Sequence, residues 1–159
     1  MKNIKYIKGD ATKPIGEGLK IIVHCCNNEG KWGAGFVLAL SKKWKSPEEK
    51  YRSWSKGWTA IPPFKLGEVL FVKVEKDIFV ANMVGQDGVG IKNGISPIRY
   101  DAINECLKKI SDGCLEAKAS VHCPRFGAGL AGGKWGEIEK LIIKNLSEKD
   151  VQVTVYDIK

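Results

Sequence analysis

The order of apolar segments along the chain predicts an α/β fold built on a mixed sheet. The last part of the chain reads helix, strand, helix, strand, and strands joined through helices pair in parallel. Residues 69–74 and 78–84 are both strand-like, and residues 75–77 between them fit a hairpin turn, which adds an antiparallel pair. We therefore expect a mixed sheet of about six strands with helices on both faces.

The other strands are predicted from their apolar patterns. Residues 4–9 alternate apolar and polar side chains, and residues 19–26 form a continuous apolar run, as in strands that are buried on both faces. Residues 120–124 form another short apolar run. Residues 151–158 alternate and are rich in β-branched side chains, which predicts a closing strand.

Helices are predicted between these strands. Apolar side chains at helical spacing follow Gly35, and they recur over residues 134–146. Two further helices are predicted from their starts, where a serine N-cap precedes a proline in the first turn: Ser46-Pro47 and Ser96-Pro97.

The composition indicates one soluble domain over residues 1–159. Hydrophobic residues make up 43% and charged residues 28% of the chain, and no apolar stretch is long enough to span a bilayer. The first 20 residues lack the apolar centre of a signal peptide. We therefore expect a cytoplasmic protein that does not associate with membranes.

The five cysteines have no disulfide-like spacing and no Cys-x-x-Cys motif, so we expect buried thiols. Two His-Cys clusters, at residues 24–26 and 122–123, lie in strands, where neighbouring side chains point to opposite faces. We expect neither a metal nor a cofactor. The net charge of +8 favours anionic partners, which leaves nucleic acid, nucleotides and simple solubility open.

Two glycine-rich loops follow buried strands and lead into helices. Residues 27–35 read Asn-Asn-Glu-Gly-Lys-Trp-Gly-Ala-Gly, and residues 126–133 read Phe-Gly-Ala-Gly-Leu-Ala-Gly-Gly. Glycines let backbone N–H groups approach a phosphate closely, and a helix start favours negative charge. Two such loops in one small domain indicate a ligand with more than one phosphate. Neither has a Walker lysine or the dinucleotide-binding fingerprint in a first βαβ unit.

Four stretches, in order along the whole chain, resemble the macro domain family: residues 6–11, 23–35, 124–130 and 153–156. The resemblance implies a three-layer α/β/α fold with a central mixed six-stranded sheet. Within the family the sequence is most similar to the branch of ADP-ribose 1″-phosphate phosphatases and terminal ADP-ribose protein glycohydrolases.

The resemblance also implies binding roles. Asp10 would accept a hydrogen bond from the adenine amino group beside the Ala11 backbone, Tyr156 would lie against adenine, and Asn27 would touch the distal ribose. Taken alone, each of these three could equally be an ordinary turn, strand or loop residue. The diphosphate would lie between the two loops, against Gly33, Ala34, Gly35 and Phe36 of the first and Phe126, Gly127, Ala128, Gly129 and Leu130 of the second.

The resemblance leaves catalysis open. The glycohydrolases of this branch use an aspartate in the second loop, where this chain has Ala131, and a lysine after the fourth strand, where it reads Val-Gly-Gln-Asp at residues 84–87. The phosphatases are similar to this chain in the spacing of His24 and Asn27. His24 is therefore the candidate acid or base, because histidine titrates near neutral pH. The competing interpretation is a hydrogen-bonded histidine packed in a strand.

We expect a protein that binds ADP-ribose or a derivative and hydrolyses ADP-ribose 1″-phosphate or an ADP-ribose conjugate. The alternative is a reader module that binds ADP-ribose without turning it over, and a nucleic-acid-binding protein is a third possibility. An ADP-ribosylated macromolecule is the expected partner, and the sequence does not indicate an oligomeric state.

Overall fold

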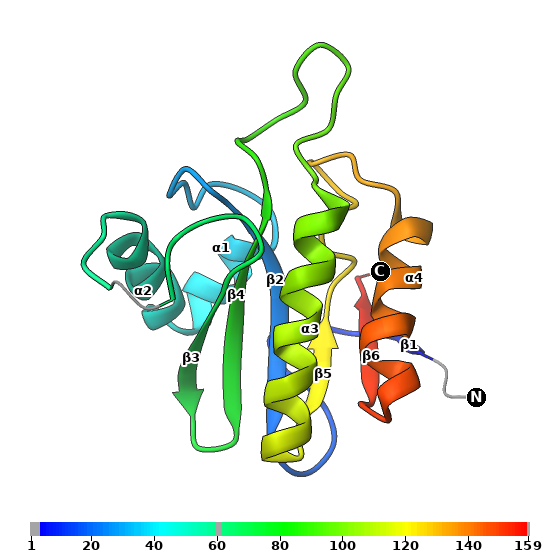
Figure 1. Cartoon of the computed structure of the whole chain (residues 1–159). Helices are drawn as coiled ribbons and strands as arrows, with labels where there is room; N and C mark the ends of the chain where they lie inside the picture. The colour runs from blue at the N-terminus through cyan, green and yellow to red at the C-terminus, as the bar shows by residue number, and fades with distance from the viewer. Residues whose placement is uncertain (1–3, 60–61, 159) are drawn as a thin grey trace.

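The computed structural model describes residues 4–59 and 62–158. Its six strands form one sheet in the order β1-β6-β5-β2-β4-β3 (Figure 1). The bounds are β1 Lys5–Lys8, β2 Lys20–Asn27, β3 Val69–Glu75, β4 Ile78–Gln86, β5 Ser120–Cys123 and β6 Val153–Asp157. Only β3 and β4 pair antiparallel, through the hairpin expected from the sequence, and all other pairs are parallel. The mixed six-stranded sheet is confirmed.

Helices cover both faces of the sheet, which gives the three-layer α/β/α architecture. Helices α3 (Tyr100–Ala117) and α4 (Trp135–Asn145) pack on one face, and α1 (Phe36–Lys43) and α2 (Ser46–Ser55) lie over the other (Figure 1). A short 3₁₀ helix, Ser147–Lys149, precedes β6. Each face has its own apolar core, centred on Ile103 and Leu107 under α3 and on Leu40 and Trp54 under α1 and α2. None of the described helices combines the length and apolar character needed to cross a membrane.

The sheet order positions the two glycine loops. Strands β2 and β5 are parallel neighbours, with Ile22 opposite His122. Their carboxyl ends therefore lie at the same edge of the sheet, where ligands bind in open α/β folds. The first loop leaves β2 and ends at α1, and the second leaves β5 and ends at α4, so both loops emerge side by side.

Two helix starts differ from the sequence prediction. Ser46 lies inside α2, and Lys45 occupies the N-cap without a side-chain cap bond. Helix α3 begins only at Tyr100, after Arg99. Ser96 instead forms a turn, because its Oγ accepts a hydrogen bond from the Ile98 amide at 3.1 Å and donates to the Ala131 carbonyl at 2.6 Å. The serine therefore ties the segment before α3 to the second glycine loop.

All five cysteines are free thiols, as expected. Cys26, Cys106, Cys114 and Cys123 are buried, and burial raises the pKa of each thiol. Cys25 is the exception to the expected burial, because its side chain is only half-buried and lines the cleft described below.

Candidate functional site

The two glycine loops face each other across one cleft. Its first compartment has a volume of about 400 Å³ and is lined by Ala34 and Gly35 from the first loop and by Gly127 and Gly129 from the second. Both loops thus border one cleft at the same edge of the sheet. A second compartment of about 400 Å³ continues from the first, with Ala34, Leu130 and Gln86 among the residues that line both. Asn27 and Gly33 line this second compartment.

Asp10, Ala11 and Tyr156 lie together at the end of the first compartment. Asp10 Oδ1 accepts hydrogen bonds from the Thr12 amide at 2.9 Å and the Thr12 hydroxyl at 2.7 Å. Burial alone would favour the protonated acid, but these two hydrogen bonds hold the pKa of Asp10 below its usual value. The carboxylate is therefore ionised at neutral pH and can accept a further hydrogen bond from a ligand.

Tyr156 contributes its ring to the first compartment, while its hydroxyl is engaged on the far side. The residue is 3% exposed, and its Oη accepts a hydrogen bond from the Ile15 amide at 2.9 Å. The side chain is therefore held in place, with only a small part of it open to the cleft.

The first glycine loop requires glycine at one position for backbone geometry. Gly35 is the N-cap of α1 with φ 78° and ψ −137°, a conformation that other residues rarely adopt. A Cβ at Gly35 or Gly33 would meet no protein atom within 4 Å, because both face open space. Among the described residues, the N–H groups of Ala34, Gly35 and Phe36 meet no protein acceptor, so they are available to an anion at a helix start.

The second glycine loop is closed by a short backbone contact. The Gly133 amide donates to the Gly127 carbonyl at 2.7 Å, and a Cβ on Gly133 would lie only 2.5 Å from that oxygen. Within the described part of the chain, the N–H groups of Gly129 and Leu130 have no protein acceptor. Phe126 is buried against Trp135 and lines the same compartment. Ala128, in contrast, is not among the lining residues, and its amide turns back toward the Arg125 carbonyl.

Asn27 organises the first loop. Its Oδ1 accepts hydrogen bonds from the Glu29 and Lys31 amides and from the Tyr51 hydroxyl, and its Nδ2 donates to the Lys31 carbonyl at 2.7 Å. Every polar atom of the side chain therefore has a partner in the protein. The asparagine holds the backbone of the loop in shape and also forms part of the wall of the second compartment.

His24 lies at the floor of the first compartment but is almost completely enclosed, with 2% of its surface exposed. Asn82 donates through Nδ2 to the Pro47 carbonyl at 3.1 Å, so its Oδ1 faces His24 and accepts the proton on Nε2. Trp32 and Phe36 pack against the ring. Burial lowers the pKa of His24 to about 4, although the bond to Asn82 acts in the opposite direction. His24 is thus a neutral, packed histidine at physiological pH.

Several cleft residues were not singled out from the sequence. Gln86 and Cys25 line both compartments, and Arg125 and Ile158 border the first. Gln86 could have been found, because it ends β4 at the same sheet edge as the glycine loops. Asp10 is the one carboxylate among the described residues that line either compartment. No group of three potential metal ligands occurs among the described residues.

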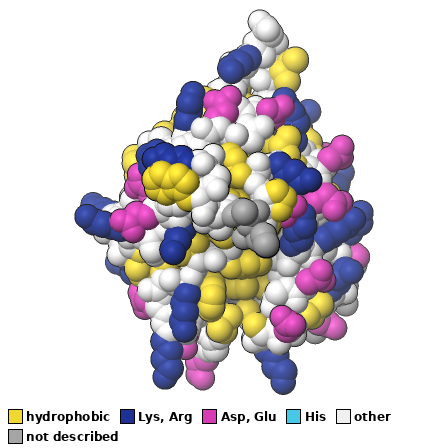
Figure 2. Space-filling model, turned by 60° about the vertical axis from the view of Figure 1, so that its left-hand side comes forward, with side chains coloured by type: hydrophobic (Ala, Val, Ile, Leu, Met, Phe, Trp, Pro, Cys, Tyr) yellow, Lys and Arg dark blue, Asp and Glu magenta, His cyan; other side chains and the backbone are white. Residues whose placement is uncertain are grey.

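The basic charge of the chain is not concentrated in one region of the visible surface. On the face in Figure 2, Lys and Arg side chains are scattered among Asp and Glu, with apolar side chains between them. Exposed Lys31, at the mouth of the second compartment, pairs with Glu29 at 3.2 Å.

No protein-family model matches the sequence, but individual proteins do. The chain is 32% identical over 97% of its length to the chromodomain-helicase-DNA-binding protein 1-like of Mus musculus, of which it spans only 18%. It is 26% identical to an ADP-ribose 1″-phosphate phosphatase of Candida albicans, with 87% of this chain and 91% of that protein aligned. An ADP-ribose glycohydrolase of Bos taurus is 23% identical over 96% of this chain and 90% of its own length.

Solved structures extend these similarities to the whole fold. A Bacteroides thetaiotaomicron protein of unknown function is 55% identical and superposes with a TM-score of 0.94 over 98% of both chains. A macrodomain protein from Streptomyces coelicolor is 46% identical, with a TM-score of 0.86 over 98% of this chain and 99% of its own. At this identity and coverage, the shared fold reflects common descent. The chain belongs to the macrodomain family.

Proposed function

We propose that this macrodomain, formed by residues 1–159, binds ADP-ribose or a close derivative along the cleft. The observation that carries the proposal is that two glycine loops with unpartnered backbone amides border one cleft, with Asp10 and Tyr156 at its end. Adenine lies between Asp10 and Tyr156, and the Asp10 carboxylate accepts a hydrogen bond from the adenine amino group.

The remaining parts of the ligand follow the cleft. The diphosphate lies between residues 33–36 and residues 126–130, where backbone N–H groups and the start of α1 favour negative charge. The distal ribose enters the second compartment beside Asn27. The Asn27 Oδ1 is occupied by three protein donors, but Nδ2 uses only one of its two N–H groups within the described part of the protein, on the Lys31 carbonyl, so the second N–H is available to the ribose.

The proposed reaction is hydrolysis of ADP-ribose 1″-phosphate or of an ADP-ribose conjugate, for which an ADP-ribosylated macromolecule is the partner. Relatives that align over nearly the whole chain carry the names ADP-ribose 1″-phosphate phosphatase and ADP-ribose glycohydrolase. His24 is the proposed acid or base. Ala131 and the absence of a carboxylate from the described lining of the second compartment disfavour a route that requires an aspartate there.

One observation favours the alternative, a reader module that holds ADP-ribose without turnover. His24 is enclosed, uncharged and bonded to Asn82, which are the properties of a histidine that stabilises the core.

The decisive experiment incubates the protein with ADP-ribose 1″-phosphate and, separately, with an ADP-ribosylated protein, and follows release of phosphate and of ADP-ribose. Turnover of either substrate supports the hydrolase. If His24 acts as acid or base, His24→Ala should lower the rate by about 10²–10⁴-fold while the Kd for ADP-ribose changes little. Tight binding without turnover of either substrate would establish the reader instead.

A further inference from the structure

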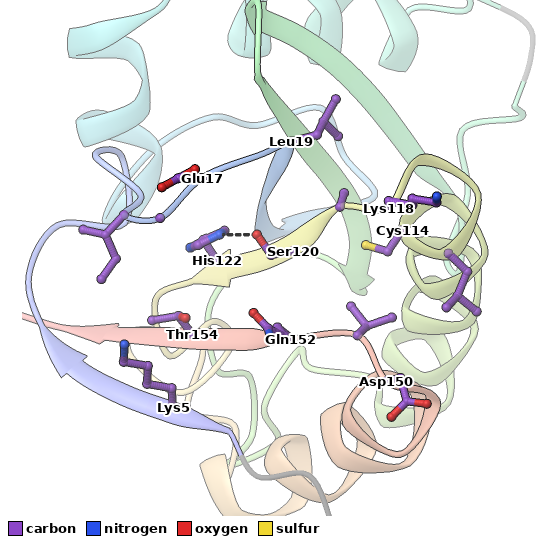
Figure 3. A pocket seen from close by; sticks show the side chains of 15 residues that line it. Lys5, Glu17, Leu19, Cys114, Lys118, Ser120, His122, Asp150, Gln152 and Thr154 are labelled. Atoms are coloured by element: carbon purple, nitrogen blue, oxygen red, sulfur yellow. Dashed lines mark hydrogen bonds between the residues drawn. The ribbon is translucent and has the colours of Figure 1, made fainter.

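Three hydrogen-bonded side chains, those of Ser120, His122 and Tyr156, form a row beside a hollow that is separate from the cleft. The hollow has a volume of about 520 Å³ and is lined by residues 15–17, between β1 and β2, and by Ser120 and His122 of β5 (Figure 3). Ser120 Oγ lies 2.8 Å from His122 Nε2, and His122 Nδ1 lies 2.7 Å from Tyr156 Oη. His122 and Tyr156 are each 3% exposed.

The direction of these hydrogen bonds follows from one fixed donor. The Ile15 amide can only donate, so Tyr156 Oη accepts from it at 2.9 Å. Within the described chain, His122 Nδ1 is the acceptor left for the hydroxyl proton of Tyr156, which places the imidazole proton on Nε2, directed at Ser120. Burial, with a smaller contribution from the nearby Lys20 charge, lowers the pKa of His122 to about 4, so the ring is neutral and Nδ1 is free to accept.

This row also fixes the segment that carries Asp10. Residues 10–19 contain no helix or strand, and residues 16 and 18 are glycines with positive φ. The segment is anchored near one end by Lys43 Nζ, which donates to the Thr12 carbonyl at 2.7 Å, and further along by the Ile15 amide on Tyr156. Thr12 in turn holds Asp10 by two hydrogen bonds. The segment is also held by the Lys13 amide, which donates to the Asp10 carbonyl at 2.9 Å, and by Lys20 Nζ, which donates to the Gly18 carbonyl at 3.0 Å. Loss of the Ile15 anchor therefore loosens the middle of the segment and shifts the Asp10 carboxylate without releasing it.

We propose that His122 is a positioning residue for base recognition: it orients the Tyr156 hydroxyl, which holds residues 10–19 and thereby the Asp10 carboxylate against the adenine amino group. This inference rests on the proposed function. His122 itself does not touch the ligand, because its side chain faces the hollow, whereas the Tyr156 ring faces the cleft.

The test compares the Kd of ADP-ribose with that of its inosine analogue, which has a carbonyl oxygen in place of the amino group. The wild type should prefer ADP-ribose by about tenfold or more, the usual value of a hydrogen bond to a charged group. His122→Phe removes the acceptor for Tyr156 and should reduce this preference by about two- to tenfold. His122→Asn offers Oδ1 near the place of Nδ1 and should restore it.

Two further variants separate positioning from a general loss of stability. Tyr156→Phe keeps the ring but removes the hydroxyl, so it should reduce the preference as His122→Phe does, and the double variant should reduce it no further. Asn145→Ala removes a part-buried hydrogen bond of 2.8 Å to Asn104, between α3 and α4, and a second one of 2.9 Å to the Leu141 carbonyl. It should lower the melting temperature without changing the preference.

The outcomes are distinguishable. If His122→Phe weakens binding of both ligands equally, His122 acts only through stability and the inference is overturned, while the proposed function stands. If the wild type binds both ligands equally, the role of Asp10 in the proposed function fails, and the inference fails with it.

Discussion

Two glycines of the first loop should respond to a methyl group in opposite ways. Gly35→Ala places a side chain on a backbone with φ 78° and ψ −137°, which costs about 1–3 kcal/mol of folding stability. Gly33 has no positive φ, and its Cβ would meet no protein atom within 4 Å, so Gly33→Ala should leave stability within about 0.5 kcal/mol of the wild type. The added methyl group then stands in the second compartment, where crowding of the ligand should weaken ADP-ribose binding by about 1–3 kcal/mol.

Thermal denaturation and calorimetric titration of both variants measure these effects. For a domain of this size, Gly35→Ala should lower the melting temperature by about 2–4 °C per kcal/mol. Gly136→Ala is the control, because this glycine lies in α4 with open space around it and should gain up to about 1 kcal/mol of stability. The reasoning is refuted if Gly33→Ala unfolds as easily as Gly35→Ala and still binds ADP-ribose as the wild type does.

Three further predictions concern charge, pH and packing. Asp10→Ala should weaken ADP-ribose binding by about 1–3 kcal/mol in calorimetry, and unchanged affinity would remove Asp10 from the site. The only two histidines, His24 and His122, each have a pKa of about 4 in the folded protein against an ordinary 6.5. The unfolded chain therefore binds more protons between these values, and urea unfolding should show stability falling by up to about 1.4 kcal/mol per histidine for each pH unit between pH 6.5 and pH 4, with no further loss from the histidines below that. Gly133→Ala should destabilise the second loop, because its Cβ would lie 2.5 Å from the Gly127 carbonyl oxygen, and an unchanged melting temperature would contradict this.

Much of the fold was predictable because it depends on local patterns. The apolar run over residues 19–26 and the alternation over residues 151–158 reflect burial on two faces and on one, and both became strands within two residues of the predicted bounds. The glycine loops were recognisable because close approach to a phosphate needs residues without side chains. Because β2 and β5 are parallel neighbours, their carboxyl ends, and therefore both loops, lie at one edge of the sheet.

The helix starts and the partners of the site residues were not predictable, because they depend on tertiary contacts. Ser96 has the sequence of an N-cap, but its Oγ closes a turn by accepting from the Ile98 amide and donating to the Ala131 carbonyl, and α3 begins only at Tyr100. Asn27 accepts a hydrogen bond from Tyr51, which lies in α2, and no local sequence pattern indicates that α2 contacts the loop. His24 was compatible with both catalysis and packing, and its hydrogen bond to Asn82 depends on the neighbouring strand, which the local sequence does not reveal.

The two compartments of the cleft differ in chemistry. In the proposed binding mode, the first compartment offers the Asp10 carboxylate to a base, and the loops offer backbone amides to a diphosphate. Among the described residues that line the second compartment, Asn27 and Gln86 are neutral and the exposed Lys31 is paired with Glu29. Such a compartment can discriminate ligands by shape, but it provides little preorganised charge for a transition state. Affinity should therefore be set mainly by Asp10, Tyr156 and the loops, whereas any turnover must depend on the few neutral polar groups at the distal end and on His24.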